Sequence, residues 1–391
     1  MKKYLIVIVK YFKPLYNIYY WIGSLIIRIL KVFVKPNDKL ILFISFGGKK
    51  FDDSPRVIYE QMIRDKRFDD YDLIWAFQDT EAFIIPRGRI IKIDSFKYYI
   101  TALKARCWIT NSTVERGLDF KGKNTLYFNT WHGTPIKKMG ADISRDNKSF
   151  GKKLKWKVDL MTSQSEYEAD IFSRVFNIDR DKFIVCGLPR NDVLSNRRME
   201  TKQKMMQRIG LPLDKKVILY APTFREYERD EKFNCVIKPP IDFDKWKKTI
   251  GDEYIILLRA HYEVAKVLNV KSNDGFVYDV SSYPVLNDLM LASDLLISDY
   301  SSIFFDYSIL NRPMLHYTYD YNEYVDKRGM YFDIRRELHG SSGDEEKLLS
   351  LIKELNYSES IGKVRDFRGK YVESYGNATN ISLDIIFKKL S

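Results

Sequence analysis

Short apolar runs alternate with longer amphipathic stretches along most of the chain. The runs carry apolar residues at consecutive positions, which is typical of strands buried on both faces of a parallel sheet. The stretches between them have the spacing of helices. This alternation predicts an α/β fold with helices on both faces of parallel sheets. The expected strands are residues 40–45, 73–76, 107–110, 125–131, 158–162, 183–186, 216–221, 254–258, 295–298 and 313–317.

A polar stretch interrupts this alternation at residues 195–210, SNRRMETKQKMMQRIG. We expect it to form a helix and a connector, with the boundary between two α/β domains close by. Two such domains that face each other form a cleft, and ligands of parallel sheets bind beyond the carboxyl ends of the strands. The predicted units are an amino-terminal segment at 1–35, a first domain at 36–200, a second at 201–365 and a carboxy-terminal helix at 366–391.

The amino-terminal segment mixes aliphatic and aromatic residues with Lys10, Lys13, Arg28 and Lys31. These cations interrupt any apolar stretch of the roughly 20 residues that a spanning helix needs. Cations beside aromatic and aliphatic side chains instead favour an amphipathic helix that lies on an anionic membrane surface. A first helix packed on the domain is the alternative.

The net charge of +13 does little to identify the partners of the protein. A basic balance suits phosphates, nucleic acid or acidic lipid headgroups alike. No nucleic-acid motif is present, so no nucleic-acid partner is expected. A basic, non-catalytic binding module nevertheless stays open as a second class of function. No carboxylate or cysteine cluster calls for a metal ion, and the site is predicted to work without metal or cofactor.

The strongest candidate for chemistry is the segment NTWHGTPIKKMG at residues 129–140. A predicted strand runs directly into His132, Gly133 and Thr134, so His132 would lie where the cleft opens. Gly133 allows a tight turn or a close approach of the backbone, and Lys137 follows within one helical turn. A histidine beside cations suits a general base that acts on a hydroxyl near phosphate. A structural histidine in a turn is the alternative.

Two further segments follow strands of the second domain. In SDYSSIFFD, at 298–306, Asp299, Ser301 and Ser302 precede a helix, and Asp306 would lie one turn further on the face of Ser302. Ser and Asp at this position either cap the helix or hold a phosphate.

In YAPTFRE, at 220–226, Thr223 and Arg225 lie in a loop after a strand. Arginine suits a diphosphate because its fork donates two parallel hydrogen bonds, whereas a surface arginine is the bland alternative. The sequence Arg259-Ala260-His261 likewise follows a strand, which would put His261 in the cleft opposite His132.

Two more segments have both a structural and a functional interpretation. In GLPRNDVL, at 187–194, Arg190 and Asp192 contact substrate or cap the following helix. In YTYDYNEYVDKRGMYFD, at 317–333, Asp320 and Arg328 lie in an aromatic, loop-rich stretch. Packing of an irregular loop by tyrosines is the alternative there.

Together these segments resemble the CDP-glycerol glycerophosphotransferase family of teichoic acid assembly. The resemblance rests on WHGTPxKxxG, GxPRNDxL, APTxR, R/K-x-H, SDYSSxxFDYxxLxxP and D-x-x-x-Y…RGxYFD, in that order, over roughly residues 125–335. Three positions depart from the family pattern. Tyr262 replaces a usual proline after His261, Phe224 replaces a common tryptophan, and polar Asn380 lies where a basic residue is often found.

The resemblance implies a GT-B fold, with two Rossmann-like domains and the nucleotide held mainly by the second. It also implies transfer of glycerol phosphate from CDP-glycerol to an undecaprenyl-diphosphate-linked saccharide, with release of CMP, by a peripheral enzyme on the cytoplasmic face of the cell membrane. A primase-like enzyme is favoured, since polymerases of the family tend to carry a large extra amino-terminal domain. A CDP-ribitol ribitolphosphotransferase, a polymerase and a GT-B enzyme using a nucleotide sugar stay open as alternatives.

In this scheme His132 is the base and His261 a second catalytic residue. Donor diphosphate or nucleotide contacts are expected from Thr223, Arg225, Asp299, Ser301, Ser302 and Asp306. Residues that touch substrate or support those that do would be Gly133, Thr134, Lys137, Arg190, Asp192, Asp320 and Arg328.

Overall fold

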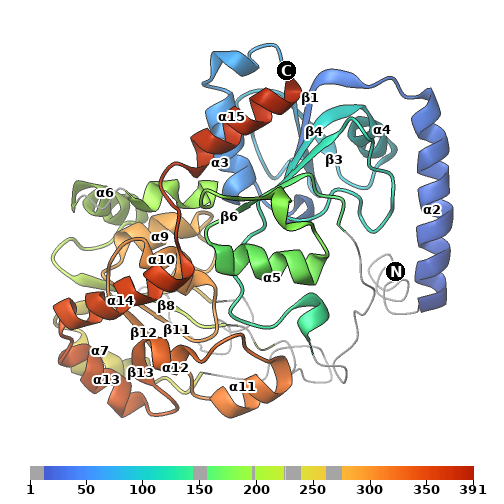
Figure 1. Cartoon of the computed structure of the whole chain (residues 1–391). Coiled ribbons are helices and arrows are strands. Elements are labelled where there is room, and N and C mark those ends of the chain that lie inside the picture. Colours follow the sequence, from blue (N-terminus) through green and yellow to red (C-terminus); the bar gives the residue numbers. More distant parts are fainter. Residues whose placement is uncertain (1–12, 144–155, 196–198, 224, 226–238, 261–274) are drawn as a thin grey trace.

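The computed structural model describes residues 13–143, 156–195, 199–223, 225, 239–260 and 275–391. Within these residues the chain forms two parallel sheets, each with helices on both faces (Figure 1). The prediction of an α/β fold with parallel sheets is therefore confirmed. We call the first sheet with its helices the first lobe, and the second sheet with its helices the second lobe.

The first sheet has seven strands in the order β3-β2-β1-β4-β5-β6-β7. Side chains alternate along β1, with Leu40, Leu42 and Ile44 on one face and Ile41 and Phe43 on the other. Helices α2 (Lys13–Phe33), α4 (Phe96–Lys104) and α5 (Glu166–Phe176) cover the first face, and α3 (Asp53–Met62) and α15 (Ala378–Leu390) the second. The strands are β1 (Asn37–Ile44), β2 (Asp72–Phe77), β3 (Arg89–Lys92), β4 (Ala105–Thr110), β5 (Leu126–Asn129), β6 (Leu160–Ser163) and β7 (Phe183–Val185).

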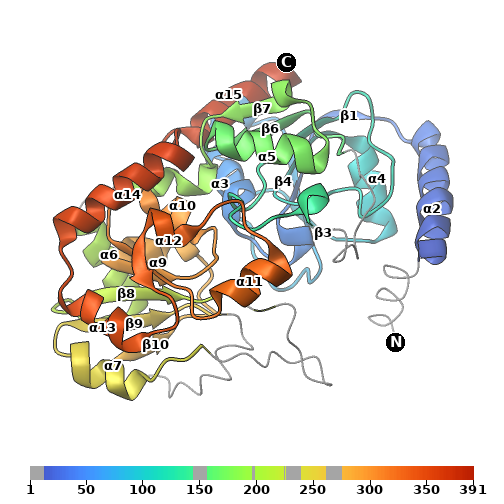
Figure 2. The ribbon, with the colours of Figure 1, turned by 60° about the horizontal axis from the view of Figure 1, so that its bottom comes forward.

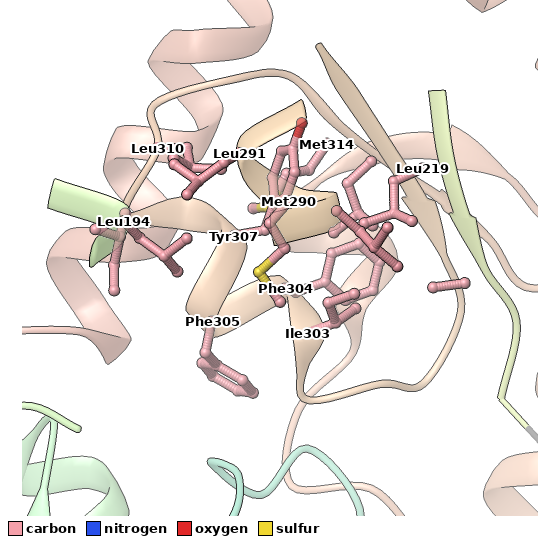
Figure 3. Close-up of a cluster of buried hydrophobic side chains, with 14 of the residues drawn as sticks. Leu194, Leu219, Met290, Leu291, Ile303, Phe304, Phe305, Tyr307, Leu310 and Met314 are labelled. Atoms are coloured by element: carbon pink, nitrogen blue, oxygen red, sulfur yellow. The ribbon is translucent and has the colours of Figure 1, made fainter. Parts of the chain in front are cut away.

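The second sheet has six strands in the order β10-β9-β8-β11-β12-β13. They are β8 (Lys216–Ala221), β9 (Tyr254–Leu258), β10 (Val277–Asp279), β11 (Leu295–Ser298), β12 (Met314–Tyr317) and β13 (His339–Ser341). One face packs against α6 (Met199–Ile209), α9 (Leu286–Ala292), α10 (Ile303–Ser308), α12 (Ile334–Glu337) and α14 (Tyr357–Tyr371). Figure 3 shows this core, in which Met290 and Phe304 lie among aliphatic side chains from strand and helices.

The opposite face of the second sheet packs against α7 (Phe243–Ile250) and α13 (Glu345–Lys353). A further helix, α11 (Tyr321–Arg328), follows β12 and reaches toward the first lobe (Figure 2).

Three strands were not predicted, and each lies at the edge of its sheet: β3, β10 and β13. An edge strand has a neighbour on one side only, so it is short and part of it faces solvent. In β3, for example, only Ile91 is buried. The continuous apolar run that marks a central strand is therefore missing from all three.

The last helix returns to the first lobe and is capped there. The carboxylate of Asp192 accepts hydrogen bonds from the backbone N–H groups of Ala378 and Thr379 at 2.9 and 2.7 Å, and from the Thr379 hydroxyl at 2.6 Å. Asp192 thus caps α15 rather than the helix that follows it in sequence. Beyond the cap, Leu383, Ile386 and Leu390 pack against the first sheet, so α15 covers the face opposite α4 and α5.

Truncating Ile386 tests how strongly α15 holds the first lobe. The side chain has no exposed surface, so Ile386→Ala should lower the free energy of unfolding by about 2–5 kcal/mol, through lost burial and the cavity left behind. Urea unfolding followed by tryptophan fluorescence measures this change. The matched control is Lys388→Ala on the exposed face of the same helix, for which we expect a change within about 0.5 kcal/mol. Equal effects of the two substitutions would contradict the packing role of α15.

Candidate active site

His132 leaves the first sheet through a sharp backbone turn. β5 ends at Asn129, and the side-chain oxygen of Asn129 accepts the N–H of Trp131 at 2.8 Å. Trp131 has a left-handed backbone with φ of 48°, which no strand can continue. The strand predicted at 125–131 was therefore too long at its end. His132 follows at the carboxyl end of a central strand, where the sequence placed it.

The His132 ring is held in one orientation and one tautomer. Its Nδ1 lies 2.7 Å from the backbone oxygen of Asn111, and the ring stacks on Trp131 with centroids 4.1 Å apart. Because a carbonyl oxygen only accepts, Nδ1 carries the proton and Nε2 of the neutral ring is an acceptor. Among the described residues Nε2 has no hydrogen-bond partner, and His132 is exposed. Nε2 is therefore open to a substrate.

Surrounding protein atoms shape the electrostatics of His132. Desolvation by nearby protein atoms lowers the pKa of His132, whereas the hydrogen bond to Asn111 and the charge of Asp53 raise it. The positive charge of Arg190 lowers the pKa of His132. Because desolvation is the largest effect, the imidazole is neutral at neutral pH and is ready to accept a proton.

The His132 loop touches the second lobe at Gly133. A Cβ atom built on Gly133 would lie 2.6 Å from Ser302 Oγ and 3.1 Å from Ser302 Cβ. Ser301 Oγ accepts the N–H of Ile303 at 3.3 Å, whereas the Ser302 hydroxyl makes no capping bond to α10. The Ser302 hydroxyl is half-buried and faces the loop that carries His132. The structure thus places Gly133, the residue after His132, against Ser302 of the second lobe.

Thr223 and Asp299 connect the ends of β8 and β11. The Asp299 carboxylate accepts the backbone N–H of Thr223 at 2.9 and 3.1 Å and that of Tyr300 at 2.7 Å. The Thr223 hydroxyl is buried and has no hydrogen-bond partner among the described residues. Asp299 therefore holds the loop after β8 in place, and the Thr223 hydroxyl is an unsatisfied polar group in that loop.

Arg225 lies in a buried ion-pair network of the second lobe. Its Nε and Nη2 donate to the two oxygens of Asp320 at 2.6 and 2.9 Å, and its Nη1 donates to Asp299 at 2.9 Å. The side chain is 1% exposed and lies among the rings of Tyr300 and Tyr324. Its donors are thus occupied by carboxylates, and a diphosphate contact at Arg225 stays a prediction. In the structure this arginine fixes Asp299 and Asp320.

The second lobe also contacts the chain just beyond the His132 loop. Lys137 and Met330 form an antiparallel bridge, and Lys138 N–H donates to Gly329 O at 3.1 Å. Arg328 Nη1 donates to the backbone oxygen of Lys138 at 3.3 Å. Met330 and Arg328 of the second lobe therefore contact Lys137 and Lys138, respectively, in the chain that follows His132.

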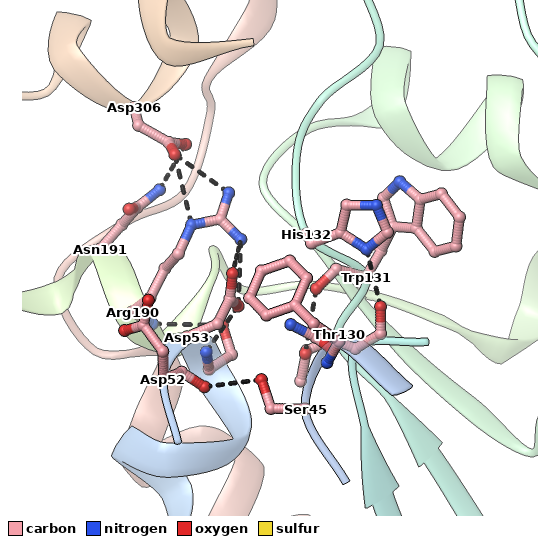
Figure 4. Close-up of polar contacts among 12 residues, drawn as sticks. Ser45, Asp52, Asp53, Thr130, Trp131, His132, Arg190, Asn191 and Asp306 are labelled. Atoms are coloured by element: carbon pink, nitrogen blue, oxygen red, sulfur yellow. Dashed lines mark hydrogen bonds and ion pairs between the residues drawn. The ribbon is translucent and has the colours of Figure 1, made fainter. Parts of the chain in front are cut away.

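Three of the remaining predicted residues, Thr134, Arg190 and Asp306, belong to a buried network of hydrogen bonds and ion pairs. Thr134 Oγ1 accepts from Gln164 Nε2, and Arg190 lies between Asp53 and Asp306, all of them buried (Figure 4). Asp306 thus points at Arg190 and Asn191 of the first lobe. His261 lies outside the described residues, and its predicted catalytic role stays a prediction.

A family model described as CDP-glycerol:poly(glycerophosphate) glycerophosphotransferase matches residues 26–388, and so extends over both lobes. The chain belongs to this glycerophosphotransferase family.

Individual members of the family resemble the chain over most of its length. A teichoic acid glycerol-phosphate transferase of Staphylococcus aureus is 38% identical over 319 residues, covering 78% of this chain and 80% of the relative. A teichoic acid glycerol-phosphate primase of Bacillus subtilis is 28% identical over 394 residues, covering 96% and 98%. Among solved structures, a variant of the wall teichoic acid polymerase TagF superposes with a TM-score of 0.84 at 32% identity, covering 93% of both chains.

Several residues of the glycerophosphotransferase site were missed by the sequence analysis, namely Asp53, Asn111 and Gln164. Asp53 starts α3, whereas Asn111 and Gln164 come just after the predicted strands 107–110 and 158–162. The rule that ligands bind beyond strand ends could have indicated them. A lone amide carries no titratable chemistry, so residue type by itself does not mark Asn111 or Gln164.

Gly133 offers a test of the contact between the lobes in this glycerophosphotransferase. In Gly133→Ala the new methyl group would meet Ser302, so the His132 loop must move. We expect kcat/KM of the transfer reaction to fall at least about 10-fold, because displacements near 1 Å at a reacting site cost up to about 100-fold.

Adding Ser302→Gly to that variant removes the clash and should restore part of the lost efficiency. Gly369→Ala in α14 is the matched control, since nothing lies within 4 Å of its added Cβ. Wild-type efficiency in Gly133→Ala would show that the two loops do not touch in solution.

Proposed function

We propose that the protein transfers glycerol phosphate from CDP-glycerol to a hydroxyl of a lipid-linked saccharide and releases CMP, in teichoic acid or related polymer synthesis. The acceptor oxygen attacks the phosphorus that bears glycerol, and the bond from that phosphorus to the CMP oxygen breaks. The acceptor proton moves to a base on the enzyme. CMP leaves with the electron pair of the broken bond, so atoms and charges balance.

The observation that carries this proposal is the state of His132. A neutral imidazole with its proton fixed on Nδ1 leaves Nε2 free to take the proton of the acceptor hydroxyl. The exposed ring lies beside Gly133, which touches Ser302 of the other lobe. A base from one lobe and a hydroxyl from the other thus flank the same space, and family membership supplies the donor.

The two lobes suggest a division of labour of the GT-B type, with two Rossmann-like units around a cleft. In this proposal the first lobe supplies the base and receives the acceptor, and the second lobe holds the CDP moiety. Ser302 and Thr223 are the side chains best placed to meet phosphate oxygens, because their hydroxyls are not committed within the described residues. Arg225, Asp299 and Asp320 keep the loop that carries Thr223 in shape.

Release of CMP tests the reaction directly. Wild-type protein is incubated with a lipid-linked disaccharide analogue and CDP-glycerol, CDP-ribitol or a nucleotide sugar in turn. We expect CMP release with CDP-glycerol. His132→Ala should reduce kcat by about 10²–10⁴-fold, the usual contribution of a general base. His316→Ala is the matched control, because that histidine is buried in β12 of the second lobe, away from the His132 loop.

Each alternative has its own outcome in this assay. Turnover with CDP-ribitol alone would favour ribitol phosphate transfer, and turnover with a nucleotide sugar alone would favour a glycosyltransferase. A ladder of products would favour a polymerase over a primase-like enzyme that adds one or a few units. No CMP release with either CDP donor, together with salt-dependent DNA binding, would favour the non-catalytic binding module.

We further propose that α2 rests on the cytoplasmic face of the cell membrane. One side of the helix docks on the first lobe, where Asp119 N–H donates to Ser24 Oγ at 2.9 Å and Ile27 is buried. Nine other apolar side chains of the helix are exposed. They are Leu15, Ile18, Trp21, Ile22, Leu25, Ile26, Ile29, Val32 and Phe33.

An apolar strip of this size on a basic protein suits an interfacial helix on anionic lipid. None of the described helices has the length and apolarity needed to cross a membrane. In both views α2 stands at the outer edge of the first lobe, away from the second lobe, where it can meet a surface (Figure 2).

Charge placed on the exposed strip should release the protein from membranes. Leu25 is 58% exposed, so Leu25→Glu leaves the fold intact while it removes apolar contact and adds repulsion from acidic headgroups. We expect binding to vesicles of phosphatidylglycerol and phosphatidylcholine to weaken about 10-fold or more in a flotation assay. The control is Leu213→Glu, which makes the same change at a position 50% exposed in the second lobe. Equal flotation of both variants would exclude α2 as the membrane contact.

A further inference from the structure

Arg190 connects the two lobes through a buried chain of charges. Its Nη1 lies 3.3 Å from both carboxylate oxygens of Asp53, at the start of α3 in the first lobe. Its Nε and Nη2 lie 3.2 and 3.0 Å from one oxygen of Asp306, in α10 of the second lobe. The three side chains are 7–8% exposed. One guanidinium thus bridges two carboxylates that belong to different sheets (Figure 4).

Other hydrogen bonds hold each member of this chain in place. Asp53 has a left-handed backbone with φ of 66°, and its Oδ1 accepts the N–H of Ser54 at 2.6 Å. On the other side, Asp306 Oδ1 accepts from Asn191 Nδ2 at 2.7 Å, and the backbone oxygen of Arg190 accepts from Asn287 at 2.9 Å. The ion pairs are therefore embedded in a network that leaves the guanidinium little freedom.

A substrate contact at Arg190, which the sequence left open, does not fit this geometry. Both edges of its fork already face carboxylates, and the side chain has almost no exposed surface. A phosphate would have to displace one of the two aspartates to reach it. Burial of charges at this seam costs solvation, and buried ion pairs add little net stability over apolar packing. Their more plausible contribution is to define one arrangement of the groups that they join.

This chain of charges also lies beside the proposed base. Figure 4 shows Asp53 and Arg190 on the side of His132 that faces α3. They are the charged groups that act on the imidazole among the described residues, Asp53 toward the protonated form and Arg190 away from it. Asp306 lies at the other end of the guanidinium from Asp53 (Figure 4).

We propose that Arg190 is a positioning residue that joins Asp53 of the first lobe to Asp306 of the second, and that it thereby holds His132 opposite Ser302. We propose in addition that Asp53, and not Asp306, sets the charge felt by His132. Both statements rest on the proposed transfer reaction with His132 as its base. They concern residues that never touch the substrate.

The test compares Asp53→Asn with Asp306→Asn, which remove the same charge from the two ends of one guanidinium. Neutral His132 is the active form, so kcat/KM is lost as pH falls through its pKa. Removing the negative charge of Asp53 lowers that pKa, so the acidic limb of the pH profile should move to lower pH by about half a unit or more. Asp306→Asn should lower kcat with the limb unmoved. Coincident limbs in the two variants would overturn the role of Asp53.

Arg190→Lys tests the positioning role, because lysine keeps the charge but not the fork that reaches two carboxylates at once. We expect kcat to fall about 10–100-fold with KM for CDP-glycerol nearly unchanged and the acidic limb in its wild-type position. Wild-type kcat in Arg190→Lys would overturn the positioning role. Circular dichroism and unfolding curves establish that each variant is folded.

Two measurements without turnover separate this inference from the proposed function. NMR titration of the His132 ring, assigned by its loss in His132→Asn, reports the pKa shift in Asp53→Asn whether or not CMP is released. Spin labels at Ile84→Cys and Leu213→Cys, both exposed and in different lobes, report the separation of the lobes, with Cys235 replaced by serine. We expect one narrow distance distribution in the parent and a broader one in Arg190→Lys. An unshifted titration or an unchanged distribution overturns the corresponding statement.

Discussion

One buried guanidinium joins carboxylates of the two lobes. Arg190 satisfies Asp53 on one side and Asp306 on the other, and neither carboxylate has another cation within hydrogen-bonding distance among the described residues. Apolar contacts also cross between the lobes, where Tyr167 of α5 packs on Phe305, Phe332 and Tyr371 of the second lobe. A pair of charges that must both be met by one planar fork does impose an orientation, since any rotation of the lobes leaves a buried charge unpaired.

Given that orientation, the site follows from sheet topology. Both sheets are parallel, and the loops at the carboxyl ends of β5 and β11 meet where Gly133 lies against Ser302. His132 leaves one sheet and Ser302 follows the other, and Gly133 lets the two loops touch because it carries no side chain. The bridge between Lys137 and Met330 secures the same loop from its other end. The placement of a base near a phosphate site is thus built from several contacts between lobes rather than from one motif.

The sequence was sufficient for the central strands and for His132, and insufficient where residues act through partners far away in the chain. A buried strand such as β8 is marked in the sequence by continuous apolar residues, and its bounds were predicted correctly. The role of Arg225 could not be foreseen, because Asp299 and Asp320 reach it from 74 and 95 residues away. A phosphate and a carboxylate both accept two parallel hydrogen bonds from an arginine side chain. Residue type alone therefore does not distinguish a ligand contact from an internal ion pair.

This ambiguity bears on how motifs of charged residues are interpreted in general. In the segment that carries Arg190 and Asp192, the first side chain ties the lobes and the second caps α15, which returns from the far end of the chain. Both residues would be retained for placing the lobes even if neither met a substrate. Charged contacts also suit such a seam better than apolar ones, because polar interfaces between domains allow relative motion when a nucleotide enters or leaves. Asp53, Arg190 and Asp306 hold the two lobes in one arrangement, and the same ion pairs would have to separate for the lobes to move apart.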